Sequence, residues 1–395
     1  MLAGAGSREL VAFMRDAIAQ RDTASEVFFA REAPGIANAA KEMAERFLLG
    51  GRLITCGSGA YATDAAHVSV EFVHPVLVGK RALPALDLSV AYRDWIPAIA
   101  GPHDMVMGFG PPQGDPEIAA ALADARALGA MTVALPGGGV GYGVASAHPD
   151  AHIHQELFEI LTHTLYESVQ VFLEYRDFGE PASASDFLYP FLGTQTHSMD
   201  AVVREAAASI VSKASDTARL RALVASEELS TIAAATQAMR RQLDAGGKLL
   251  LFGNGGSATD ANDWALDCVL RDDTSKPVPA ISLAMEPACI TAIANDVGVD
   301  VIFLRQLIAQ AKPNDVAVAL STSGGSKNVL MALAEARKRG MLTVALLGYD
   351  GGEIARDRLA DFVIVVRSDY IPRIQEVQGT IYHLMRRGLD VASAA

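Results

Sequence analysis

Apolar positions along the chain follow two spacings that alternate. Residues 7–48 place apolar side chains at i, i+3, i+4 and i+7, the spacing of amphipathic helices. Short apolar runs without alternation follow, such as LITC at 53–56 and MTVAL at 131–135. Helical stretches, such as PEIAAALADARALG at 116–129, stand between the runs. Strands of this kind separated by helices are typical of a parallel sheet that helices cover on both faces.

The second half of the chain repeats this order. GGKLLLFGNGG matches GGRLITCGSGA at an offset of 196 residues, and LTVALLG matches MTVALPG at an offset of 211. The closing helices, IQEVQGTIYHLM and HQELFEILTHTL, match at an offset of 220. An ordered series of matches predicts a tandem duplication. We therefore expect a first domain at 1–178, a linker at 179–198 and a second domain at 199–395.

Length and composition agree with two soluble domains. The 395 residues exceed the usual size of a single core, and half of them are hydrophobic. The net charge of −13 argues against a nucleic-acid or anionic-membrane partner. No signal-peptide pattern and no apolar run of membrane-spanning length is found, so a cytoplasmic location is expected. Three cysteines without metal-type spacing indicate reduced thiols.

Two glycine- and hydroxyl-rich turns of the second half lie between a predicted strand and a helix. They are GNGGS at 253–257 and STSGGS at 321–326. The N-terminus of a helix attracts anions through its unpaired N–H groups and its dipole. Serine and threonine at such places often only cap the helix. Two such turns at neighbouring strand ends instead favour a phosphate site that needs no cationic side chain.

The segments FGNGGSATDA, TAIANDVG, STSGGSKNVL and RIQEVQGTIYHL resemble the signature segments of the sugar isomerase (SIS) domain family. They are most similar to its phosphoheptose isomerase branch, which interconverts sedoheptulose 7-phosphate and D-glycero-D-manno-heptose 7-phosphate. The resemblance is specific over 201–390 and weak over 7–175. It implies an α/β fold of two tandem SIS domains, each a doubly wound parallel sheet flanked by helices, of the flavodoxin or Rossmann-like type.

The resemblance also implies the residues of the site. The phosphate-binding residues would be Asn254, Gly255, Ser257, Ser321, Thr322, Ser323 and Ser326. The family binds zinc through His and Glu four residues apart on one helix, and through Gln and His eight residues apart on the closing helix. The first copy matches with His67, Glu71, Gln155 and His163. Its phosphate turns have changed, because Tyr61 replaces a serine and FGPPQGDPE replaces the second turn.

The second copy shows the opposite pattern. Its phosphate turns, Gln375 and His383 are intact, whereas Asp263 and Asp267 replace the histidine and the glutamate. The resemblance therefore implies a composite site, in which the second copy binds the phosphate and the first contributes the metal and the proton-transfer groups.

Aldose–ketose isomerisation moves a proton between C1 and C2 through an enediol. We expect Glu71 to be the base and His163 its acid partner, with His67 and Gln155 holding zinc. Zinc could be replaced by another divalent ion or be absent. Since family members are tetramers of single domains, the expected assembly is a homodimer that forms a pseudo-tetramer.

Two alternatives remain open. The second copy could work alone, with Asp267 and His383 as catalytic groups and Asp263, Asp267, Gln375 and His383 as the metal set. The chain could also be a non-catalytic sugar-phosphate sensor or assembly protein.

Overall fold

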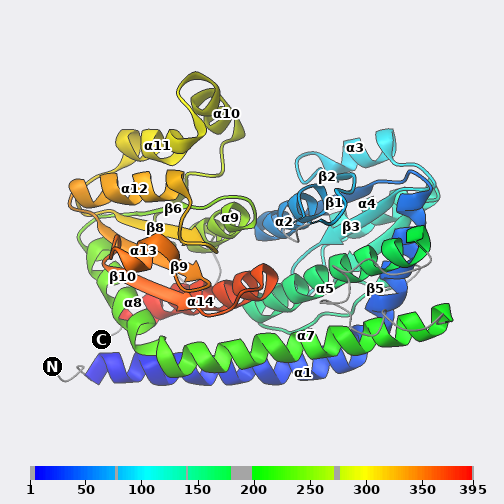
Figure 1. Ribbon diagram of the computed structural model, residues 1–395, viewed down its shortest axis with the longest axis horizontal. Helices are drawn as coiled ribbons and strands as arrows, with labels where there is room; N and C mark the ends of the chain where they lie inside the picture. The colour runs from blue at the N-terminus through cyan, green and yellow to red at the C-terminus, as the bar shows by residue number, and fades with distance from the viewer. Residues whose placement is uncertain (1–4, 76–78, 139–140, 179–197, 271–275, 394–395) are drawn as a thin grey trace. The chain divides into compact units, whose positions relative to one another are not determined.

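The computed structural model describes residues 5–75, 79–138, 141–178, 198–270 and 276–393. The chain divides into two compact units: a first unit, Arg21–Asp216, and a second unit, which combines Met1–Gln20 with Thr217–Ala395 (Figure 1). Residues 5–20 thus belong with the second half of the chain. Residues 179–197 of the predicted linker lie outside the described residues, and the predicted domain limits of 1–178 and 199–395 stay predictions.

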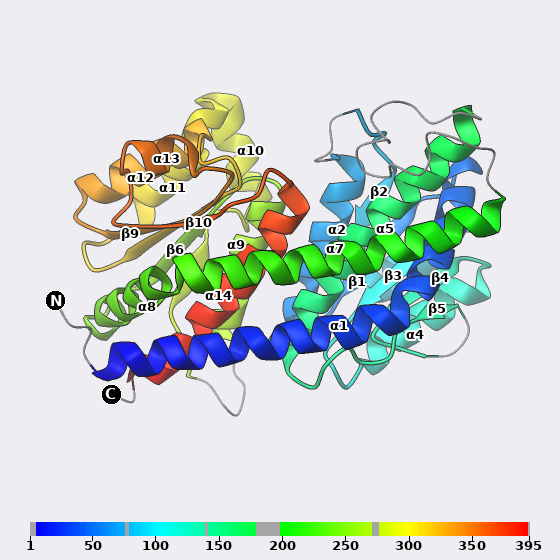
Figure 2. The same cartoon turned by 60° about the horizontal axis from the view of Figure 1, so that its bottom comes forward.

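The first unit contains a five-stranded parallel sheet in the order β2-β1-β3-β4-β5. The strands are β1 (Leu53–Gly57), β2 (Ala85–Asp87), β3 (Met105–Phe109), β4 (Met131–Leu135) and β5 (Tyr142–Gly143). Its helices are α2 (Ala62–Val73), α3 (Tyr92–Ile99), α4 (Pro116–Ala127) and α5 (Ala151–Phe178), with a short 3-10 helix, η1 (Gly59–Tyr61). Two long helices, α1 (Ala5–Leu48) and α7 (Met199–Glu227), also contribute to its core (Figure 2).

The second unit has the same architecture, with the sheet order β10-β9-β8-β6-β7. Its strands are β6 (Leu249–Phe252), β7 (Ala280–Ser282), β8 (Val316–Ser321), β9 (Leu342–Gly348) and β10 (Phe362–Val366). Its helices are α8 (Leu229–Asp244), α9 (Gly256–Val269), α10 (Pro287–Asp296), α11 (Ile302–Gln310), α12 (Lys327–Lys338), α13 (Gly352–Arg356) and α14 (Ile371–Ser393), with η3 (Val299–Val301). The prediction of two parallel-sheet α/β domains is confirmed.

Apolar burial explains why each sheet is covered on both faces. Every residue of β1, β3, β6 and β8 is buried, as the runs without alternation predict. In the second unit, α8, α9 and α14 pack on one face and α11 and α12 on the other (Figure 1). In the first unit, α1, α2 and α5 share one core and α4 packs in the other.

Each unit has the same kind of internal ion pair at the amino ends of its central strands. Arg52 donates to Asp104 at 2.8 Å in the first unit, and Lys248 to Asp315 at 2.5 Å in the second. A Cβ atom on the glycine before either residue, Gly51 or Gly247, would lie 2.0 Å from a backbone oxygen of the neighbouring loop. Glycine is therefore needed at both positions, and this edge of each sheet is closed by the chain itself.

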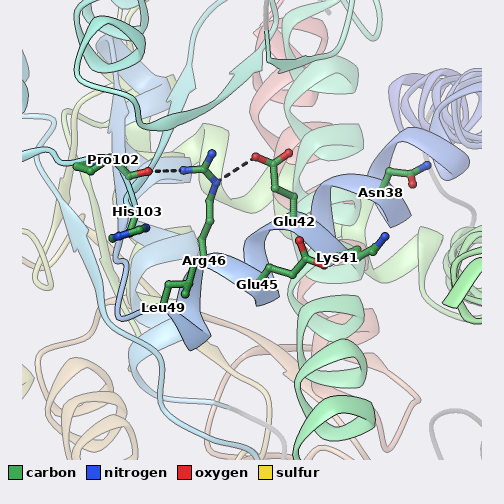
Figure 3. A pocket seen from close by; sticks show the side chains of 8 residues that line it. All are labelled: Asn38, Lys41, Glu42, Glu45, Arg46, Leu49, Pro102 and His103. Atoms are coloured by element: carbon green, nitrogen blue, oxygen red, sulfur yellow. Dashed lines mark hydrogen bonds and ion pairs between the residues drawn. The ribbon is translucent and has the colours of Figure 1, made fainter.

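A shallow pocket lies at the same edge of the first unit (Figure 3). Arg46 donates there to Glu42 at 3.0 Å and to the carbonyl oxygen of Pro102 at 2.8 Å. We assign no function to this pocket, because Arg46 is paired with Glu42 and the pocket lies at the amino ends of the strands. Among the described residues, no helix is both long and apolar enough to cross a membrane.

His154 fixes two loops of the first unit to helix α5. Its Nδ1 accepts a hydrogen bond from the N–H of Ala147 at 3.3 Å, so its Nε2 carries the proton and donates to the carbonyl oxygen of Gly110 at 3.2 Å. Burial lowers the pKa of His154 from 6.5 to about 4, against the opposing effect of the Gly110 carbonyl. The imidazole is therefore neutral at physiological pH.

We expect this histidine to make folding sensitive to mild acid. Because its pKa is lower in the folded state, its contribution is fully present above pH 6.5 and is lost as the pH falls from 6.5 to 4. Between pH 7 and pH 5 the parent should lose about 2 kcal/mol of unfolding free energy relative to a His154→Gln variant. Urea unfolding of both proteins at the two pH values measures this loss. If the difference in unfolding free energy between parent and variant is the same at pH 7 and pH 5, the lowered pKa of His154 is wrong.

Candidate active site

The strand order of each sheet creates one switch point. In the second unit the chain leaves β6 for β7 on one side and continues to β8 on the other, so β6 and β8 are neighbours with connections in opposite directions. Ligands of open α/β sheets bind at the carboxyl ends of such strands. The turn before α9 and the turn before α12 both lie at this place, as the sequence predicts.

A pair of asparagines joins the two turns. The Nδ2 of Asn254 donates to the Oδ1 of Asn328 at 2.9 Å, and the Nδ2 of Asn328 donates back to the Oδ1 of Asn254 at 2.9 Å. Asn254 comes from the first predicted turn, whereas Asn328, in the first turn of helix α12, was not among the predicted site residues. This reciprocal pair holds the starts of two helices against each other.

Glycines and hydroxyls set the path of the second turn. Gly324 has a φ of +62°, and a Cβ atom on it would lie 2.1 Å from the carbonyl oxygen of Gly351, so a side chain is excluded there. The Oγ of Ser321 accepts from the N–H of Gly324 at 3.1 Å, and the Oγ of Ser323 from that of Gly325 at 3.3 Å. These two predicted phosphate residues therefore also shape the loop.

The remaining predicted residues differ in their exposure. Ser257 is buried in the first turn of α9, whereas Asn254 and Gly255 are exposed and Thr322 and Ser326 are partly buried. Ser326 is the residue before α12, and its side chain makes no capping hydrogen bond to that helix. The starts of α9 and α12 thus offer backbone N–H groups and hydroxyls at one edge of the sheet.

Three of the four predicted metal or catalytic residues of the first unit come together. The Nε2 atoms of His67 and His163 lie 3.2 Å apart, and the Oε1 of Glu71 lies 3.6 Å from the former and 3.3 Å from the latter. All three side chains are buried. Ligand atoms around a tetrahedral zinc ion, at bond lengths near 2.0–2.2 Å, stand about 3.4 Å from one another. The three atoms, the Nε2 of His67, the Nε2 of His163 and the Oε1 of Glu71, form a triangle whose spacing fits such an ion.

The electrostatics of the triangle favour an ionised carboxylate. Burial alone raises the pKa of Glu71, but His163 and His67 outweigh it and hold the pKa below its ordinary value. Glu71 is therefore a charged base at neutral pH, next to two imidazole groups.

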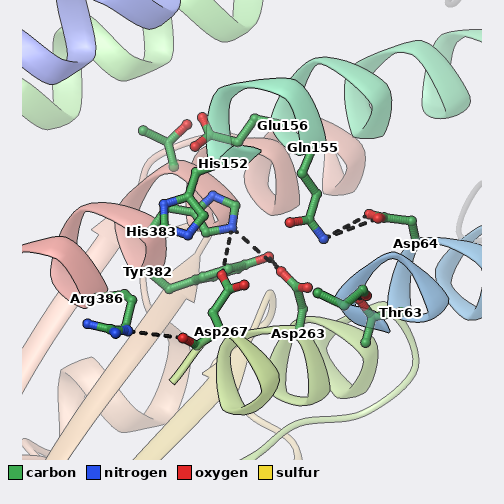
Figure 4. A network of polar contacts seen from close by, with 12 residues as sticks. Thr63, Asp64, His152, Gln155, Glu156, Asp263, Asp267, Tyr382, His383 and Arg386 are labelled. Atoms are coloured by element: carbon green, nitrogen blue, oxygen red, sulfur yellow. Dashed lines mark hydrogen bonds and ion pairs between the residues drawn. The ribbon is translucent and has the colours of Figure 1, made fainter. Parts of the chain in front are cut away.

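The fourth predicted residue, Gln155, points elsewhere. Its Nε2 donates to both carboxylate oxygens of Asp64, at 3.2 and 3.1 Å (Figure 4). Glu159, one helical turn further along α5, instead groups with His67 and His163, with their ligand atoms within 4.8 Å of one another. We did not predict Glu159 from the sequence, although its spacing of four residues from both Gln155 and His163 marks the same helix face.

The second unit has a related group on α9 and α14. The Nε2 of His383 lies 3.6 Å from Asp263 and 3.3 Å from Asp267, and the hydroxyl of Tyr382 donates to Asp263 at 2.7 Å (Figure 4). Burial and the charge of Asp263 raise the pKa of Asp267 to about 6, while His383 opposes them. Gln375 is buried two turns earlier on α14.

Comparisons with known proteins identify the family of this chain. A model of the SIS domain matches residues 214–348. The phosphoheptose isomerase of Solidesulfovibrio magneticus is 41% identical over 182 residues, which are 46% of this chain and 88% of that protein. The chain belongs to the SIS domain family. The phosphoheptose isomerase of a Geobacter species (strain M21) is 48% identical over 142 residues, or 36% of this chain and 73% of that protein.

A solved structure resembles both units in its fold. The C-terminal domain of glucosamine-fructose-6-phosphate aminotransferase from Francisella tularensis matches 97% of this chain and 96% of its own length, with a TM-score of 0.60. At 10% sequence identity this likeness concerns the fold alone. Membership of the family supports sugar-phosphate isomerisation or binding as the kind of function.

Proposed function

We propose that this SIS-family protein is an aldose–ketose isomerase that converts sedoheptulose 7-phosphate to D-glycero-D-manno-heptose 7-phosphate. The observation that carries the proposal is the buried pair of Glu71 and His163, 3.3 Å apart, which combines a charged carboxylate with an imidazole. The substrate follows from the relatives of this chain named phosphoheptose isomerase.

The turns at the switch point of the second unit are the proposed phosphate anchor. The helix starts of α9 and α12 supply N–H groups, and Ser257 and Thr322 supply hydroxyls, so no lysine or arginine is required. This suits a chain with a net charge of −13. The composite arrangement expected from the sequence stays a prediction.

The first unit carries the proposed proton transfer. Glu71 removes the proton from C1 of the ketose while His163 donates a proton to the carbonyl oxygen at C2, which gives the enediol. Glu71 then returns the proton to C2, and the hydroxyl proton of C1 leaves to His163, which gives the aldose. Both groups end in their starting protonation states. The oxidation of C1 to an aldehyde balances the reduction of C2 to an alcohol within the substrate, so no redox partner is consumed.

The same part of the first unit suits a divalent ion. His67 and Glu159 are the residues that would hold zinc, next to Glu71 and His163, which keep their part in the proposed proton transfer. When bound, the ion would polarise a substrate oxygen. His67 keeps the imidazole of His163 in place at 3.2 Å in either case.

Removing the proposed ligands should weaken zinc binding measured without any substrate. Titration of the parent against a zinc chelator should show one site that His67→Ala abolishes. Glu159→Gln should lower its affinity by about tenfold or more, because a carboxylate ligand is lost. Gln155→Ala is the matched variant on the same helix face and should bind zinc like the parent. If Gln155→Ala lowers the zinc affinity and Glu159→Gln does not, then Gln155 is the ligand, as the family resemblance implies.

Solvent exchange tests the activity itself. In D2O the parent should incorporate deuterium at C1 of sedoheptulose 7-phosphate and at C2 of the aldose product, as followed by NMR. A panel of ketose phosphates with five to seven carbons gives the chain-length preference. Tight binding of these compounds without any exchange would contradict the isomerase and favour the sugar-phosphate sensor.

One observation favours a second location for the chemistry. Asp267 and His383 lie 3.3 Å apart in the same unit as the phosphate turns, and a carboxyl group with a pKa of about 6 suits a general base near neutral pH. In this variant of the proposal the second unit isomerises the substrate alone.

A further inference from the structure

Two helices begin at the switch point of each unit. The units differ in the residue that precedes the later of these two helices, which is α4 in the first unit and α12 in the second. In the first unit this residue is Asp115, before α4, and in the second it is Ser326, before α12. Ser326 follows Asp115 by 211 residues, the offset that also relates the flanking strands β3 to β8 and β4 to β9. The two residues therefore occupy the same place in two similar folds.

The carboxylate of Asp115 already occupies the start of its helix. Its Oδ1 accepts from the N–H of Glu117 at 2.7 Å and from that of Ile118 at 3.3 Å. The side chain of Ser58, in the turn after β1, also lowers the pKa of this carboxyl group. Ser58 is the counterpart of Asn254, at an offset of 196. The carboxylate of Asp115 thus caps α4 and is also influenced by the side chain in the turn after β1.

These hydrogen bonds keep the carboxylate charged. Burial raises the pKa of Asp115, but Ser58 and the bonds from Glu117 and Ile118 outweigh burial and lower the pKa below its ordinary value. A fixed negative charge with acceptor oxygens at a helix start is what a bound phosphate group would also provide.

The second unit lacks this internal anion and has more donors. The side chain of Ser326 makes no capping hydrogen bond to α12. The loop before it contains Ser321, Thr322 and Ser323, whereas the loop of the first unit has Gly110, Pro111 and Pro112 at the same positions. Proline has no N–H group, so the first loop offers neither the hydroxyls nor all of the backbone donors of the second.

We propose that the carboxylate of Asp115 is a built-in substitute for a phosphate group, which closes the switch point of the first unit to phosphate esters. Each chain then binds one sugar phosphate, in the second unit. This inference rests on the proposed phosphate anchor in the second unit. It adds the number of phosphate groups bound per chain, and it names Asp115 as the residue that limits this number to one.

Exchanging the two residues tests the inference, with inorganic phosphate as the probe in calorimetric titrations. The parent should bind one phosphate per chain. Ser326→Asp places the carboxylate in the second unit and should weaken binding by about tenfold or more, because like charges repel. Ser326→Asn has nearly the same size as Ser326→Asp without the charge, so it should weaken binding clearly less than Ser326→Asp does. Since aspartate is a good cap, the thermal midpoint of Ser326→Asp should not fall.

The opposite exchange should open the first unit. Asp115→Gly removes the internal anion at little cost to the cap and should raise the stoichiometry to two phosphates per chain. Asp115→Glu, which keeps a negative charge at the helix start, should remain at one. A parent that binds two phosphates, an Asp115→Gly variant that binds one, or a Ser326→Asp variant that binds like Ser326→Asn would overturn the inference. A parent that binds no phosphate would overturn the proposed anchor as well.

Discussion

Neighbouring parallel strands whose connections leave in opposite directions bring two helix N-termini to one edge of a sheet. Everything proposed for phosphate binding depends on this constraint. Between β6 and β8 it joins the turns that precede α9 and α12, and the reciprocal pair of Asn254 and Asn328 fixes their separation. The amino ends of the strands are closed by contacts such as Lys248 with Asp315, so the carboxyl ends are left for a ligand.

A strongly acidic chain can use such an edge because backbone dipoles, rather than cationic side chains, attract the anion. The first unit has the same edge between β1 and β3 but fills it with Asp115. Its chemistry is concentrated instead on the facing surfaces of α2 and α5, where Glu71 lies within 3.6 Å of both His67 and His163. One architecture thus presents a donor-rich edge in the second unit and a self-capped edge in the first, while each unit also carries a buried acid–base cluster.

The sequence alone was sufficient to predict the two parallel sheets and the proximity of His67, Glu71 and His163. Apolar runs without alternation predicted fully buried strands, and four-residue spacings predicted that His67 and Glu71 share a helix face. Contacts between distant segments could not be predicted, because spacing does not specify rotamers. Gln155 therefore bonds to Asp64, and Glu159 takes a place near the histidines. The association of residues 5–20 with the second half likewise depends on tertiary packing of Leu10 and Met14.

Which unit performs the proton transfer is the central claim, and one comparison of turnover numbers tests it most directly. Glu71→Gln and Asp267→Asn each remove one buried carboxylate charge with little change in size. With sedoheptulose 7-phosphate as substrate, Glu71→Gln should lower kcat by about 10²–10⁴-fold, the usual contribution of a general base, while Asp267→Asn stays within a few-fold of the parent. A collapse of kcat in Asp267→Asn together with parental kcat in Glu71→Gln would place the chemistry in the second unit and contradict the account.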